Sequence, residues 1–464
     1  METSADRIDD ANCRRNSSRR QRNAVSGPGV TNSPRLTSPL SDTVGAVSSH
    51  PFRPLRRRSV LLVWGAGVIS DIGTWVQLIV VGSLVARETG SAVYTGLTAL
   101  AMFTPQGLCA PIGGLLADKF DRRRVFIGAL FGQAAATTLL AVVLAQGQRQ
   151  PFALSAIIVI SSAAGAIGQP AFSAMLPDLV PPEELMAMVA LGVHSWNAGR
   201  IVGPVLGTVL VAVAGPAWTI GFNAVTFAGM AVAVSMLHRS FAPPGSQEEG
   251  IRQRLAEGWR VLQTVPGCRY GIAIIMMLNL AVAPFMGLIP IYARELFDGD
   301  TGLAGTFSAV QGAGSILGSL IITVLAMRMG RGRLVGISAA VLVVVYACYA
   351  VAPTPFLAGA ALLVMGGGAT SLFVTGSTIV QRDAPPGERG RILSISQAGM
   401  GLCYGTGMLW ISALADFTSL REAFLVAAAV AGIGGLVVSA KVPGWRAVVD
   451  GTAVDSAKLA VAAA

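Results

Sequence analysis

Charged residues are scarce in this chain. Asp, Glu, Lys and Arg together make up 12% of its 464 residues, whereas a soluble globular domain carries about 25%. Hydrophobic residues make up 53%, so the remaining polar side chains are too few to cover a globular surface. The composition argues against an ordinary water-soluble protein and predicts that lipid surrounds most of the folded chain.

Cysteine and histidine are also scarce, with five and three residues that are scattered along the chain. They form no Cys-x-x-Cys pair and no Cys/His cluster, so the sequence predicts no metal site and no cofactor. It also contains no nucleophile elbow and no phosphate-binding loop of the Walker type. We therefore expect that the protein is not an enzyme and does not use ATP directly.

Long apolar runs are abundant from Leu61 to Ala440. Each is close to the roughly 20 residues that a helix needs to cross a bilayer. The runs are continuous and lack an alternation of period two, which favours helices over a β-barrel. The sequence predicts an all-α membrane protein with twelve transmembrane helices, at residues 61–86, 92–117, 125–146, 153–176, 186–214, 217–236, 271–293, 303–326, 334–352, 356–380, 392–414 and 420–440.

The basic residues are distributed unevenly between the two sets of loops. One set contains most of the Lys and Arg, including a cluster at 122–124, whereas the other set contains only Arg87, Arg149, Arg294 and Arg421. Loops rich in Lys and Arg stay in the cytosol, so both termini are predicted to be cytosolic. The net charge of +10 is then a topology signal, and we expect no nucleic-acid partner.

These features divide the chain into five parts. Residues 1–59 are rich in Ser, Arg, Pro and Asn, which predicts a disordered cytosolic tail. Residues 60–236 and 271–440 are two six-helix halves. Residues 237–270 form a cytosolic central loop with an amphipathic helix near 253–263, and residues 441–464 form a second cytosolic tail.

A short internal repeat supports the division into halves. Residues 173–184 and 377–388 share a Ser, a Pro-Pro pair and a Glu at one constant offset, and both segments follow equivalent spans. Two parallel six-helix repeats are typical of secondary transporters, whose substrate site lies near the midplane between the repeats. Coincidence in two proline-rich loops is the alternative.

The loop between the second and third spans contains a motif. It reads Gly114-Leu-Leu-Ala-Asp118-Lys119-Phe-Asp121-Arg122-Arg123-Arg124. This resembles the signature of the major facilitator superfamily, with Asp121 in place of the second glycine of the pattern.

The resemblance to the superfamily implies two six-helix halves that move against each other. It further implies a charge-paired latch between the halves, in which residues have conformational roles and do not bind substrate. The latch residues carried over from the motif and its surroundings are Gly114, Asp118, Lys119, Arg122, Arg123 and Asp178.

Two further segments, 70–77 and 197–207, resemble the branch of multidrug, macrolide and siderophore exporters. Gly203, Pro204 and Gly207 match part of the span-five signature of drug antiporters, whereas Thr208 and His194 replace two of its glycines. A proline inside a helix removes a backbone hydrogen bond. We therefore expect a helix hinge at Gly203, Pro204 and Gly207, with helix packing alone as the alternative.

Only two formal charges, Asp71 and Arg200, lie inside the predicted spans. A charge at the centre of a transmembrane helix costs about 2.5–3.5 kcal/mol on insertion scales and faces a cavity or a partner. The functional interpretation makes Asp71 the protonation site and lets Arg200 tune it or contact an anionic group. The alternative is a structural Asp71–Arg200 ion pair, in which Asp71 would be a poor proton carrier. His194 is a third proton-coupling candidate.

Polar uncharged residues inside the spans are Gln77, Gln169, Asn279, Gln311, Gln397 and Tyr404. In the superfamily, spans one, four, seven and ten line the cavity, which favours the first three as substrate contacts. Met276, Met277, Met286 and Phe285 could give the seventh span an adaptable apolar wall, with lipid or core packing as the alternative for each methionine.

The sequence as a whole predicts a multi-pass secondary transporter of the plasma (inner) membrane, a monomer that exports small amphipathic organic molecules in exchange for protons. A narrow-specificity metabolite permease and a non-transporting membrane receptor or scaffold are the alternatives.

Overall fold

The computed structural model describes residues 52–237, 241, 251–329, 331–385, 389–441 and 445–450. These residues form helices and connecting loops, and no strand occurs among them. The predicted all-α fold is confirmed. Residues 1–51 of the predicted tail lie outside the described residues. The last part of this tail contains the short helix η1 (Arg53–Arg56) and the start of α1.

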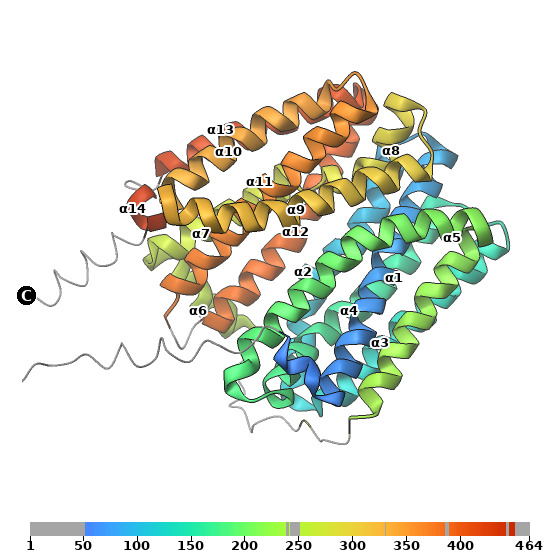
Figure 1. The fold of residues 1–464 in the computed structure, drawn as a ribbon, viewed down its shortest axis with the longest axis horizontal. Coiled ribbons are helices and arrows are strands. Elements are labelled where there is room, and N and C mark those ends of the chain that lie inside the picture. The colour runs from blue at the N-terminus through green and yellow to red at the C-terminus, as the bar shows by residue number, and fades with distance from the viewer. Residues whose placement is uncertain are drawn as a thin grey trace, which may run out of the picture. The chain divides into compact units, whose positions relative to one another are not determined.

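The N-terminal half comprises α1 (Arg58–Thr89), α2 (Ala92–Lys119), α3 (Arg122–Ala145), α4 (Pro151–Leu179) and α5 (Leu185–Ser235). These helices, blue to green in Figure 1, form one bundle. Helix α1 ends at Gly90, which adopts φ 61° and ψ 17°, a left-handed conformation that glycine adopts without strain. Ser91 then caps α2 by accepting a hydrogen bond from the backbone N–H of Tyr94.

Helix α5 contains a break at Gly215, where φ is 80° and ψ is 169°. This backbone conformation is accessible to glycine and strained for other residues, and Pro216 follows it directly. The break separates two arms that correspond to the spans expected at 186–214 and 217–236.

The C-terminal half runs from α7 to α13. Its first span is assembled from three pieces, α7 (Pro266–Met277), the π-helical turn η3 (Leu278–Val282) and α8 (Phe285–Phe297). The other long helices are α9 (Thr301–Met329), α10 (Arg331–Ala350), α11 (Pro355–Asp383), α12 (Arg389–Phe417) and α13 (Leu420–Lys441). These yellow to red helices form the second bundle in Figure 1.

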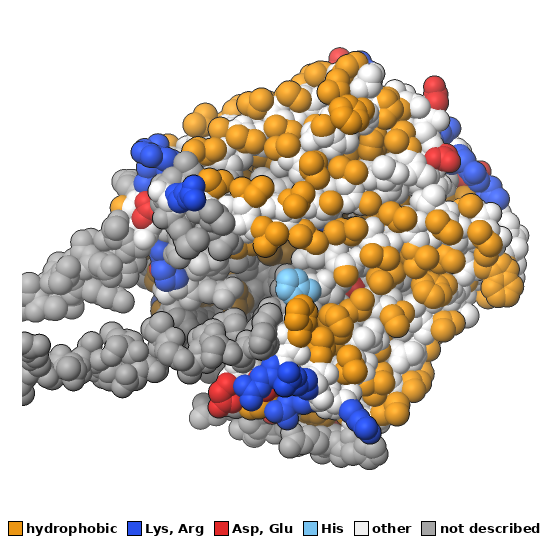
Figure 2. Space-filling model, viewed as in Figure 1, with side chains coloured by type: hydrophobic (Ala, Val, Ile, Leu, Met, Phe, Trp, Pro, Cys, Tyr) orange, Lys and Arg blue, Asp and Glu red, His pale blue; other side chains and the backbone are white. Residues whose placement is uncertain are grey.

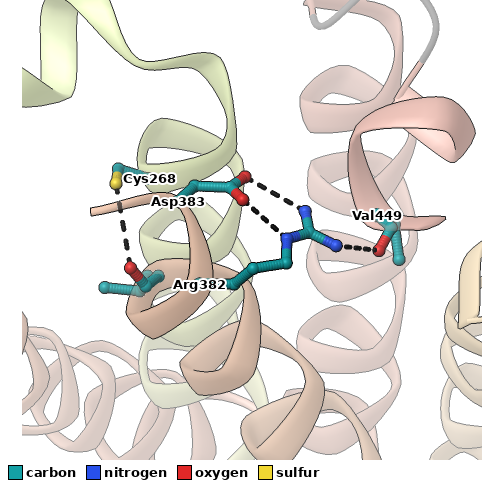
Figure 3. Close-up of polar contacts among 5 residues, drawn as sticks. Cys268, Arg382, Asp383 and Val449 are labelled. Atoms are coloured by element: carbon teal, nitrogen blue, oxygen red, sulfur yellow. Dashed lines mark hydrogen bonds and ion pairs between the residues drawn. The ribbon is translucent and has the colours of Figure 1, made fainter. Parts of the chain in front are cut away.

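Two shorter helices flank the C-terminal half. Helix α6 (Ile251–Thr264) contains the predicted amphipathic segment, and α14 (Trp445–Asp450) lies in the predicted C-terminal tail. Figure 3 shows how α14 is held: Arg382 pairs with the carboxylate of Asp383, and its Nη1 also donates to the carbonyl of Val449 at 3.0 Å. The backbone N–H of Gly332 donates to Asp450 at 2.7 Å, so α14 connects the adjoining ends of α10 and α11.

Ten helices in the described part of the chain are long and apolar enough to cross a membrane. Hydrophobic side chains cover most of the face seen in Figure 2, and the charged side chains gather at its margins. Both observations agree with a multi-pass membrane protein. The count of twelve spans, the limits of the five parts and the cytosolic position of both termini remain predictions.

Glycine residues allow helices of the C-terminal half to approach one another closely. A Cβ atom at Gly314 of α9 would collide with the carbonyl of Leu363 in α11, and one at Gly318 would collide with the Cα of Gly367. Small residues allow such close backbone approach in lipid, where packing drives helix association.

We predict that Gly314→Leu strongly destabilises the protein, because a side chain there forces α9 and α11 apart. Overpacking costs about 1–3 kcal/mol, occasionally more. The matched control is Gly435→Leu in α13, since a Cβ at Gly435 has nothing within 4 Å. Thermal melting of both detergent-solubilised variants checks this, and equal melting temperatures would show that the crossing tolerates a side chain.

Candidate functional site

Three glycines of α5, at Gly199, Gly203 and Gly207, are spaced by four residues and therefore share one helix face. This face packs directly against α1. A Cβ at Gly203 would lie 2.6 Å from the Cβ of Trp75, and one at Gly199 would lie 2.8 Å from the carbonyl carbon of Asp71. These glycines therefore pack α5 closely against α1, which agrees with the packing alternative. A hinge at Gly203 and Pro204 remains a prediction, because the non-helical residue inside α5 is Gly215.

The close contact of α1 and α5 brings the residue before Arg200 against the backbone of Asp71, but the two charged side chains have separate partners. Asp71 is half-buried, and its Oδ2 accepts a hydrogen bond from the hydroxyl of Ser195. Arg200 donates from Nη2 to the hydroxyl of Ser315 in α9. Among the ion pairs of the described residues, none joins Asp71 to Arg200. The structural pair that was the alternative for these two charges is not formed in this structure.

A pocket lies between the two halves. Its cavity volume is only about 20 Å³, so the pocket is nearly closed in this conformation. Both halves contribute to its walls. The lining residues are Trp75, Leu78, Ile79 and Gly82 of α1, Thr98 of α2, Arg200 and Pro204 of α5, Met286, Gly287, Ile289 and Pro290 of α8, and Ser308 and Gln311 of α9.

The three predicted cavity residues do not line this pocket. Gln77 is buried and its Oε1 accepts from Asn223 Nδ2 at 2.8 Å, inside the N-terminal half. Asn279 is buried in the π-helical turn and donates to the carbonyl of Ile275 at 2.8 Å. Gln169 is exposed on α4. Their expected place in the pocket is taken instead by Gln311 and Met286.

One feature of the sequence indicates the pocket wall, although the polarity of the residues alone does not. Trp75 lies one helical turn after Asp71, its side chain is 4% exposed, and its ring meets that of Trp196 edge-on at 5.4 Å. A tryptophan beside an intramembrane acid is the feature that could have identified this wall. His194 is exposed next to Ser195, and its proton-coupling role remains a prediction.

The motif between α2 and α3 forms contacts inside the N-terminal half. Arg122 Nη1 donates to the carbonyl of Ala174 at 3.1 Å and lies 3.8 Å from Asp178 Oδ2. Arg123 Nε donates to the carbonyl of Val234 at 3.1 Å, and its Nη2 donates to the neighbouring carbonyl of Ser235. Asp178, one of the predicted latch residues, therefore pairs with Arg122. The latch between the halves remains a prediction, because the partners shown here all belong to one half.

The other motif positions have distinct surroundings. Lys119 is exposed, Asp118 is half-buried, and a Cβ at Gly114 would have nothing within 4 Å. Asp121, which replaces a glycine of the family pattern, caps α3 by accepting from Arg124 N at 3.0 Å and also accepts from Phe241 N at 3.0 Å. The departure from the pattern thus supplies a helix cap.

The opposite ends of the helices, called here the outer end, are joined across the two halves. Asp416 at the end of α12 accepts hydrogen bonds from Ala92 N at 2.7 Å, Val93 N at 3.3 Å and the Ser91 hydroxyl at 2.5 Å. The first N–H groups of a helix have no partner within the helix and favour a negative charge. Asp416 therefore satisfies the start of α2 from the other half of the protein.

Arg294 of α8 makes the complementary contact. Its Nη1 donates to the carbonyl of Ala86 in the last turn of α1, where a positive charge is favourable. We call these two cross-half contacts, by Asp416 and Arg294, the outer clamp. The hairpin of α1 and α2 is thus held at both helix ends by opposite charges from the C-terminal half.

Closer to the middle of the helices, the halves meet closely at glycine residues. A Cβ at Gly401 of α12 would lie 2.9 Å from the Cα of Gly107 in α2, and one at Gly312 of α9 would lie 2.8 Å from Cγ1 of the Ile201 side chain. Hydrogen bonds and glycine contacts thus join the two halves from the outer clamp to the level of Ser315, where Arg200 of α5 donates to α9.

The family model of transmembrane secretion effectors, within the major facilitator superfamily, matches residues 49–460. The chain belongs to this family. It is 26% identical over 388 residues to the multidrug efflux pump Tap of Mycobacterium tuberculosis, covering 81% of this chain and 92% of that protein. It is 21% identical over 374 residues to macrolide efflux protein A of Streptococcus pyogenes, covering 78% and 91%.

The fold of this chain resembles that of solved transporters. The nucleoside transporter NupG superposes with a TM-score of 0.64 at 14% identity, covering 83% of this chain and 99% of that one. The predicted superfamily and the efflux-type relatives are confirmed. The fold and family are those of transporters, which are not enzymes.

The position of Gln77 leads to a prediction about stability. Gln77→Leu should destabilise the protein, because it leaves the buried amide of Asn223 without its partner, a loss of about 1–3 kcal/mol. Gln169→Leu, on the exposed face of α4, is the matched control and should leave the melting temperature unchanged. If Gln77→Leu instead leaves stability intact and changes substrate preference, Gln77 belongs to the binding site after all.

Proposed function

We propose that this protein is a proton-coupled exporter of amphipathic organic compounds, working by alternating access in the plasma membrane as a monomer with cytosolic termini. The observation that carries the proposal is the pocket whose walls come from both halves. A site at the interface of two six-helix repeats can face either side of the membrane as the halves rock around it. The named efflux relatives support export as the direction of transport.

Asp71 is the proposed proton carrier. It is an acid within a membrane helix, and its partner in this structure is the neutral hydroxyl of Ser195. Without a paired cation, the carboxyl group can bind and release a proton as its surroundings change. Trp75 follows one turn later and lines the pocket, so a change at Asp71 can reach the substrate through α1.

The outer clamp supports the alternating-access part of the proposal. Its contacts cross between the halves and hold the outer end closed, and each of them can break without unfolding a helix. Opening the outer end would expose the pocket to the other side of the membrane. The cluster around Arg122 and Arg123 lies at the opposite ends of the helices, where the family's latch would close.

The two alternatives predict different behaviour. A narrow permease would move one metabolite with saturable kinetics and would ignore unrelated dyes. A receptor or scaffold would move nothing and would have no need for Asp71 inside the membrane.

The experiment is efflux of the neutral lipophilic dye Nile red from energised cells that express the protein. We expect the protein to lower dye accumulation, an uncoupler to abolish the effect, and Asp71→Asn to lose it because an amide carries no titratable proton. The control is Asp298→Asn, which removes an exposed acid at a residue with φ 49°, a conformation that asparagine tolerates. It should retain full efflux.

Uncoupler-sensitive efflux in the Asp71→Asn variant would show that another group carries the proton. No effect of the wild-type protein on Nile red would favour a narrow permease or a scaffold over the multidrug exporter.

The outer clamp gives a separate conformational prediction. Asp416→Asn should open the outer end, because it removes the charge at the N-terminus of α2, worth about 1 kcal/mol or about a fivefold change in the ratio of closed to open forms. Spin labels at Gln148 and Phe417, placed after the native cysteines are replaced, report the distance across the outer end. A longer distance component that grows in Asp416→Asn is expected, and an unchanged distribution would show that the outer clamp does not hold the closed form.

A further inference from the structure

Arg200 is half-buried and lacks the oppositely charged partner that a charge inside a membrane helix normally has. Its Nη2 donates to the hydroxyl of Ser315, a neutral group, and its Nε is buried without a hydrogen-bond acceptor. The ion pairs found among the described residues do not include Arg200. A guanidinium has five N–H donors and stays protonated in proteins, so most of its hydrogen-bonding capacity is unused here.

Arg200 is one of the residues that line the pocket. Trp75, Ile79, Met286 and Pro290 line it as well. Charged groups inside a membrane are costly unless they have a partner or reach a water-filled cavity. A ligand that brings an oxyanion to Arg200 would supply the missing acceptors, and a planar carboxylate could do so with two parallel hydrogen bonds.

The other residues that line the pocket indicate the chemistry of the remaining part of such a ligand. Trp75, Ile79, Met286 and Pro290 present apolar surface, and methionine adapts to irregular shapes. The polar side chains of Ser308 and Gln311 are neutral. The pocket therefore combines one cation with an apolar wall and contains no acidic side chain.

We propose that Arg200 is the anion-binding residue of the pocket and that the transported compounds are amphipathic organic acids, whose carboxylate meets Arg200 and whose apolar body lies against Trp75 and Met286. This inference rests on the proposed transport function and narrows its substrate class. A purely structural Arg200, tying α5 to α9 through Ser315, is the competing explanation.

The test uses a matched pair of tritiated probes, 1-naphthylacetate and its neutral amide, 1-naphthylacetamide. Binding of each to the purified full-length protein is measured by scintillation proximity. We expect the wild-type protein to bind the carboxylate about tenfold more tightly than the amide, since hydrogen bonds to charged groups are stronger than neutral ones. Arg200→Gln should remove this preference and leave binding of the amide unchanged.

Three variants separate ligand binding from packing. Ser315→Ala removes the present partner of Arg200 and keeps the charge, so it should retain the preference, whereas a structural role predicts that it behaves like Arg200→Gln. Arg200→Lys keeps the charge without the planar fork and should retain part of the preference. Arg149→Gln, at an exposed outer-loop arginine that pairs with Glu88, is the charge-matched control and should behave as wild type.

Equal affinity of the wild-type protein for the two probes, or an equal loss of both probes in Arg200→Gln, would overturn the inference. Nile red efflux by the wild-type protein distinguishes failure of the substrate inference from failure of the proposed transport function. Efflux without a carboxylate preference refutes only the substrate class, and a carboxylate preference without efflux refutes only the exporter. If the wild-type protein binds neither probe, the inference is also refuted.

Discussion

The contact between α1 and α5 determines where every candidate functional group lies. Gly199, Gly203 and Gly207 let the backbone of α5 approach the backbone of α1 at Asp71 and Ile72 and the side chain of Trp75. Trp75 packs on this glycine face and also lines the pocket, to which Arg200 of α5 contributes. Ser195, one helical turn before Gly199, donates to Asp71.

The interface between the halves follows a different principle. Its outer end is held by charges on helix ends, where Asp416 and Arg294 satisfy backbone groups that α2 and α1 cannot satisfy themselves. Such contacts are strong enough to close the protein and involve few residues. They can be exchanged for water at the membrane surface, whereas the glycine contact of α1 with α5 cannot separate without exposing backbone to lipid. In the proposed cycle, the outer contacts would break and the glycine contact would persist.

Hydropathy, loop charges and the motif around Asp118 were sufficient to predict the helices and the superfamily, because each depends on residues adjacent in sequence. The pocket depends on helix rotation, which sequence position does not determine. Gln77 follows Trp75 by two residues and so points to a different face, where Asn223 binds it. The sequence also did not predict the separate partners of Asp71 and Arg200, because nothing in it distinguishes Ser195 and Ser315 from other serines. Gln311 and Met286 were named among wider sets, but nothing in the sequence ranked them above Gln169.

Arg200 connects the pocket to the movement of the halves. Its present partner, Ser315, belongs to the C-terminal half, whereas Arg200 belongs to the N-terminal half. In the proposed cycle, separation of the halves at the outer end would stretch this bond and leave a buried guanidinium with even fewer acceptors. A bound carboxylate would replace the lost acceptor and lower the free energy of that separation. A ligand shifts a conformational equilibrium only by its differential affinity for the two states, and an arginine that loses its protein partner in one of them is a direct source of such a difference.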